Sequence, residues 1–152
     1  MTVNLQLVAA QYLLDYVDTD ALASAATEAL LDGIDSPSIR RLAGMKGADP
    51  TEAQAVFSAA LGELQIQSPT AREAAMLVAT DLALRITQGK ILPYDGAKQI
   101  WRIHTGFSEE HLQELDPFVY AASEWEVRPD DRDYFAAAIV AAAGQLVRAQ
   151  VR

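Results

Sequence analysis

Apolar residues recur at helical spacing along almost the whole chain. The first series consists of Leu5, Val8, Ala9, Tyr12, Leu13 and Tyr16. Each of these residues lies three or four positions from another, which places all six side chains on one stripe of a helix. Apolar and polar residues nowhere alternate for long enough to predict a β-strand. The pattern therefore predicts an all-α protein.

Polar and proline residues mark where these helices begin and end. Ser-Pro or Asp-Pro pairs stand at 36–37, 49–50 and 68–69. Each pair predicts a helix start, because the first side chain can cap the helix and proline is tolerated in the first turn. Asp18-Thr19-Asp20 offers another cap, and Gly33 suits the left-handed end of a helix.

The later part of the chain continues in the same way. We expect further helices over 69–88, over 93–106, and from Ser108 with a break at Pro117 that leaves 118–126 as a second half. A final helix follows Asp130. Because all the connections are short, residues 1–152 are predicted to form a single all-helical domain, a compact bundle of seven or eight short helices.

The amino-acid composition excludes several kinds of metal site and catalysis. The chain has 152 residues and no cysteine, which excludes disulfides, cysteine-ligated zinc, iron–sulfur clusters and thiol catalysis. Polar Asn4 and Gln6 interrupt the region where a secretory leader would be apolar, and no apolar run approaches the roughly 20 residues that span a bilayer. We expect a cytoplasmic protein that has no membrane partner.

Charge is negative overall and is concentrated in two blocks, residues 1–35 with a net charge of −6 and residues 107–135 with −7. The net charge is −9, and residues 107–135 alone contain nine acids against Arg128 and Arg132. A negative field repels phosphate backbones, so nucleic-acid binding is disfavoured. The same field attracts a basic protein partner.

The two histidines, His104 and His111, are the candidates for metal binding. With Glu109, Glu110 or Glu124 they would supply the two-histidine, one-carboxylate ligand set. However, no H-x-x-x-H or H-E-x-x-H spacing puts two ligands on one face of a single helix. We therefore predict a structural role for both histidines and no metal site.

Catalytic signatures are also missing from the sequence. The glycines at 44 and 47 have neither the length nor the Lys-Ser/Thr ending of a phosphate loop, and no serine stands in a G-x-S-x-G context. We predict no catalytic residue and no cofactor, and expect that the protein is more a binding protein than an enzyme.

The stretch 118–126 combines aromatic and acidic side chains. Phe118, Ala122 and Trp125 share one helix face, and Tyr94 and Trp101 lie on the preceding predicted helix. These rings either fill the core of an alanine-rich bundle or line a pocket or anchor patch.

Three segments resemble small all-helical proteins of high-GC actinobacteria to which no activity is attached. They are residues 32–44, 94–101 and 122–125, and nine arginines against three lysines fit the same coding bias. The resemblance implies a helical fold and transfers no catalytic residue. Some small acidic helical proteins act as immunity or antitoxin partners. This analogy concerns the class of protein and does not rest on a site.

The leading prediction is a non-enzymatic acidic interaction protein, immunity-like or an adaptor, that binds a basic protein partner. Its predicted contact residues are Glu109, Glu110, Glu124, Trp125, Glu126, Asp130 and Asp131. The alternative is a small-molecule-binding or enzymatic bundle with an aromatic pocket, lined by Tyr94, Trp101, Tyr120 and Trp125. A homodimer is a further alternative, built on a stripe of the last helix that carries Ala137, Ala141, Gly144 and Arg148.

Overall fold

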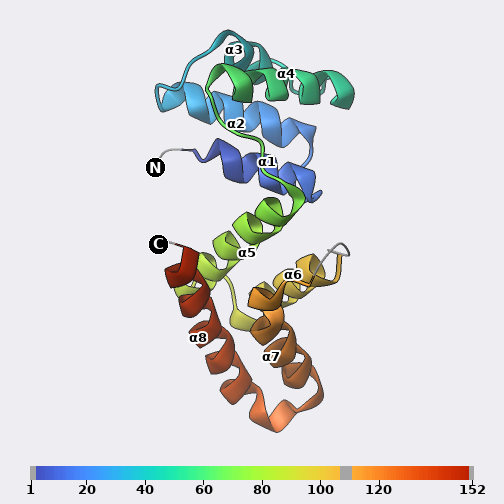
Figure 1. Ribbon diagram of the computed structural model, residues 1–152, viewed down its shortest axis with the longest axis vertical. Coiled ribbons are helices and arrows are strands. Elements are labelled where there is room, and N and C mark those ends of the chain that lie inside the picture. The colour runs from blue at the N-terminus through green and yellow to red at the C-terminus, as the bar shows by residue number, and fades with distance from the viewer. Residues whose placement is uncertain (1–2, 107–110, 151–152) are drawn as a thin grey trace. The chain divides into compact units, whose positions relative to one another are not determined.

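The computed structural model describes residues 3–106 and 111–150, and most of these residues are helical. These residues form eight α-helices and two short 3-10 helices, η1 and η2, with no β-strand among them (Figure 1). The predicted all-α class is confirmed. The chain divides into two compact units, residues 1–74 and 75–152. That residues 1–152 form one domain stays a prediction.

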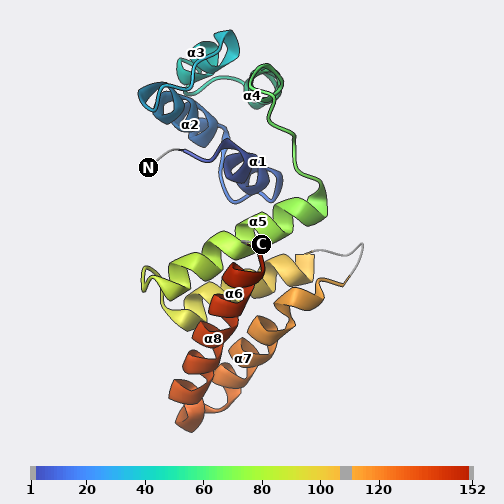
Figure 2. The ribbon, with the colours of Figure 1, turned by 60° about the vertical axis from the view of Figure 1, so that its left-hand side comes forward.

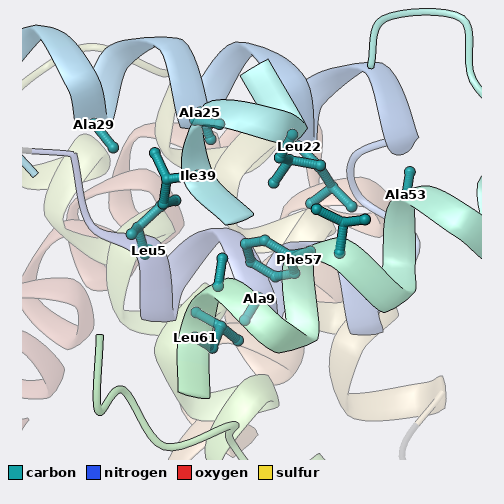
Figure 3. Close-up of a cluster of buried hydrophobic side chains, with 13 residues drawn as sticks. Leu5, Ala9, Leu22, Ala25, Ala29, Ile39, Ala53, Phe57 and Leu61 are labelled. Atoms are coloured by element: carbon teal, nitrogen blue, oxygen red, sulfur yellow. The ribbon is translucent and has the colours of Figure 1, made fainter. Parts of the chain in front are cut away.

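The first unit contains four helices. They are α1 (Leu5–Leu13), α2 (Thr19–Leu31), α3 (Pro37–Ala43) and α4 (Pro50–Glu63). Helix α2 packs against α1, α3 and α4, and α3 also packs against α4. Their buried faces meet in one hydrophobic cluster, in which Leu22, Ile39 and Phe57 are the large side chains of α2, α3 and α4 (Figure 3).

The predicted helix starts at Asp18, Ser36 and Asp49 are confirmed by their hydrogen bonds. The side chain of Asp18 accepts from the backbone N–H of Ala21 at 3.0 Å, and that of Ser36 accepts from Ile39 at 3.2 Å. Asp49 caps α4 in the same way, with proline following it in the first turn. Each side chain satisfies a backbone donor that the helix itself leaves unpaired.

Two predicted boundaries were wrong. Helix α1 ends at Leu13 rather than Tyr16, because Asp15 adopts a left-handed conformation with φ of 60°. Helix α5 (Ala71–Thr87) is capped by Thr70 and not by Ser68. Glu73 Oε1 accepts from the Thr70 N–H at 3.0 Å, while Thr70 Oγ1 accepts from the Glu73 N–H at 3.1 Å. This reciprocal pair is a capping box, which outweighs the proline signal one residue earlier.

The second unit contains most of α5 together with the helices that carry the candidate site residues. These are α6 (Pro93–Gly106), η1 (Gln113–Leu115), α7 (Asp116–Val127), η2 (Pro129–Asp131) and α8 (Arg132–Gln150). Helices α7 and α8 lie side by side, joined by η2 at one end (Figure 2). The predicted break at Pro117 is close to the true start of α7, and the four residues before His111 lie outside the described residues.

Helix α6 approaches α5 closely at Gly96. A side-chain carbon at this position would lie 2.6 Å from Ile86 Cδ1 and 2.8 Å from Ile91 Cδ1. Glycine is therefore required for the two elements to pack at this distance. The contact fixes the start of α6 and, through it, the positions of the side chains farther along that helix.

None of the helices in the described residues is both long enough and apolar enough to cross a membrane.

Candidate functional site

The acidic residues of α7 and η2 surround a basic side chain. Arg128 donates to Glu124 Oε2 at 3.4 Å and to Asp131 Oδ2 at 2.8 Å. These carboxylates raise the pKa of Arg128, with the hydrogen bond to Glu124 as the largest cause. Two predicted contact residues are thus brought together, and their joint charge is reduced by one.

Trp125 is half-buried and covered on both faces. One face stacks on the ring of Tyr94, with centroids 3.9 Å apart and planes inclined by 15°. The guanidinium of Arg132 lies 4.0 Å from the indole centroid on a cation–π contact, and its Nε donates to the Trp125 carbonyl. The stack joins α6, α7 and α8 and holds the indole in place, and the contact role expected for Trp125 stays a prediction.

The remaining predicted contact residues are spread around this stack. Glu126 is exposed and accepts from the Tyr94 hydroxyl at 3.1 Å, which supports the Trp125 stack from the side. Asp130 is exposed in η2. Glu109 and Glu110 lie outside the described residues.

Among the described residues of this unit, the most exposed aromatic side chains are two tyrosines that were not predicted as contact residues. Tyr120 is 62% exposed and Tyr134 is 71% exposed. Both rings contact the edge or face of the buried Phe135, at centroid distances of 6.3 and 5.0 Å, and Arg128 lies over the same ring at 5.4 Å. We call the resulting patch the α7–α8 surface, which consists of Tyr120, Glu124, Arg128, Asp131 and Tyr134.

A pocket of about 510 Å³ lies along α6, with one wall from α7. Its lining residues are Lys98, Trp101, Arg102, Thr105, Gly106 and Glu126. Of the aromatic residues expected in a pocket, Trp101 is in the wall and half-buried, whereas Tyr94 stacks on Trp125 and Tyr120 lies at Phe135. The lining thus places two cationic side chains and one carboxylate beside an indole.

Both histidines converge on a single carboxylate. His104, in the last turn of α6, places Nε2 3.0 Å from Asp116 Oδ1, and His111 places Nε2 2.8 Å from Asp116 Oδ2. The rings meet edge to face with centroids 5.2 Å apart. The hydrogen bond from His111 is the main reason that the pKa of Asp116 lies below its usual value, and the bond from His104 acts in the same direction.

Asp116 was not among the carboxylates expected beside the histidines, which were Glu109, Glu110 and Glu124. His111 was expected inside a helix, but it precedes η1. Asp116 starts α7, where a carboxylate is favoured by the helix dipole. The sequence signal that identifies it is Asp116-Pro117, the same Asp-Pro helix start that was recognised at 49–50.

Comparison of the chain with protein-family models, with curated proteins and with solved structures finds no match.

Proposed function

We propose that the protein is a non-enzymatic interaction protein whose α7–α8 surface binds a basic protein partner. The observation that carries the proposal is the pair of exposed tyrosines, Tyr120 and Tyr134, set beside carboxylates on adjacent helices. Tyrosine is enriched at interface hot spots because it brings a large rigid ring with few rotatable bonds. Around it, an excess of carboxylates favours arginine and lysine on the partner.

The negative charge of the α7–α8 surface favours a cationic partner. Residues 107–135 carry a net charge of −7, and the two carboxylates on Arg128 leave the α7–α8 surface negative. Exposed Glu126, Asp130 and Asp133 extend the negative field beyond the surface. A cationic partner is steered toward such a field, whereas an acidic one is repelled. The tyrosine faces also attract arginine and lysine by cation–π contacts.

Binding should weaken when either the field or the tyrosines are removed. Proteins captured from a lysate on the immobilised chain are identified, and the dissociation constant of each is then measured with purified components. We expect a basic partner whose Kd rises at least about tenfold between about 50 mM and about 500 mM salt. The double variant Tyr120→Ser/Tyr134→Ser should raise Kd about 30-fold, the loss expected for a hot spot of about 2 kcal/mol.

A matched control comes from the first unit. Leu31 is a large exposed apolar side chain and Asp15 an exposed acid, so Leu31→Ser/Asp15→Asn removes comparable groups outside the α7–α8 surface. This variant should bind as the parent chain does. A partner with negative net charge, or a Kd unchanged by the tyrosine substitutions, would contradict the proposal.

The pocket along α6 favours a second candidate, binding of a small aromatic anion. Its volume falls in the usual range for small-ligand sites, and Lys98 and Arg102 flank Trp101. Indole-3-carboxylate is a suitable probe, and it should raise the melting temperature and change the emission of Trp101. Arg102→Ala should abolish both effects. A melting temperature that is equal with and without the probe would eliminate this candidate.

A further inference from the structure

We propose that His104, His111 and Asp116 form a binding site for a divalent transition-metal ion such as Zn²⁺. The inference is independent of the proposed partner surface, because it rests on a different group of side chains. Its starting observation is that one ligand atom from each of the three residues lies within 4.8 Å of the other two.

The donor set suits this class of ion. Two imidazoles and one carboxylate are a recurrent ligand set for zinc and for ferrous iron, whereas calcium and magnesium prefer oxygen ligands alone. In both histidines the ligand atom is Nε2, and both Nε2 atoms point at the same carboxylate. The chain has no other histidine, so its whole imidazole content is gathered here.

The geometry requires little rearrangement. Zinc bonds of about 2.0–2.1 Å place the donor atoms of a tetrahedral site roughly 3.4 Å apart. Each Nε2 is already within 3.0 Å of an Asp116 oxygen. Bringing the two imidazoles together around an ion takes a movement on the order of 1 Å, which small rotations of exposed side chains provide.

Access and charge also favour a cation at this position. The side chain of His111 is 62% exposed and that of Asp116 is 45% exposed, so an ion can enter from solvent, while His104 is 20% exposed and holds its ring in place. The surrounding segment has a net charge of −7, which raises the local concentration of cations. Three protein ligands leave one tetrahedral position for water or for a ligand from outside.

The competing explanation is a hydrogen-bonded clamp without metal. In that case Asp116 joins the end of α6 to the start of α7 by accepting hydrogen bonds from the Nε2–H groups of both imidazoles. The two explanations differ in stoichiometry and in the state of the nitrogens. A bound ion replaces the proton on each Nε2, whereas the clamp requires those protons.

Zinc titration of the full chain, purified without a polyhistidine tag, distinguishes them. We expect saturable calorimetric binding at one ion per chain. In nitrogen-15 spectra both Nε2 signals should shift together and stop changing at one equivalent, and the two histidines make the spectrum simple to assign. Asp116→Asn, which keeps the size of the side chain, should weaken zinc binding at least about tenfold.

Asp133→Asn is the matched control, since it removes an exposed acid in the first turn of α8. It should bind zinc as the parent chain does, and the circular dichroism of both variants should match that of the parent. Binding that needs only one histidine, binding at several ions per chain, no saturable binding, or equal affinity in Asp116→Asn would each overturn the proposal.

Discussion

Phe118→Ala should lower the free energy of unfolding of the second unit by about 3–5 kcal/mol. The ring is the largest side chain among those almost fully buried, at 1% exposure, and it lies on the first turns of α7, near Asp116. Truncation removes its transfer energy and leaves a cavity that the surrounding helices only partly fill. A loss of this size is a large part of the roughly 5–15 kcal/mol that stabilise a typical domain.

Urea unfolding followed by tryptophan fluorescence measures this effect. Both tryptophans, Trp101 and Trp125, belong to the second unit, so their emission reports on its unfolding. Val127→Ala, at the exposed end of the same helix, is the control and should change the unfolding free energy by no more than about 0.5 kcal/mol. If Phe118→Ala cost no more than this control, the described core of the second unit would be wrong.

Phe57→Ala should destabilise the first unit by a similar amount, about 3–5 kcal/mol. Its ring is 4% exposed and lies at the centre of the cluster formed by α1 to α4 (Figure 3). Far-ultraviolet circular dichroism is the appropriate measurement, because it records the loss of helix in both units. Ser58→Ala is the matched control, since residue 58 is the next position on α4 and is exposed. It should leave the transition nearly unchanged.

The same variant tests the prediction that residues 1–152 are one domain. If the two units unfold as one cooperative system, dichroism and tryptophan fluorescence give coincident transitions, and Phe57→Ala shifts both. If they unfold separately, Phe57→Ala shifts the dichroism curve and leaves the tryptophan curve in place. The second result would refute the single-domain prediction.

Helices and most of their starts follow from the sequence because they depend on local interactions. The apolar spacing gave the all-α class, and Ser36 and Asp49 were recognised because a capping side chain bonds to a backbone group only three residues away. The errors arose where a second local signal competed. At Thr70 a capping box prevailed over Ser68-Pro69, and at Asp15 a left-handed residue ended a helix whose apolar pattern continued.

The candidate sites were harder to predict because they depend on contacts between helices. Glu124 and Asp131 were selected for their charge, and their common partner Arg128 was missed although it stands four residues after Glu124 and three before Asp131, a spacing that the sequence shows. Spacing along the chain excluded a metal site, since His104 and His111 share no helix face. The packing of α6 against α7 brings the end of α6 close to Asp116, and both histidines meet at this carboxylate at the start of α7.

The Tyr94–Trp125–Arg132 stack gives the molecule an internal optical probe. The guanidinium that covers the indole is itself exposed and sits beside the acidic residues of η2. Any molecule that draws Arg132 away uncovers one side of the ring to water, which moves the emission of Trp125 to longer wavelength. Binding near Arg132 can therefore be followed by intrinsic tryptophan fluorescence, without attaching a dye.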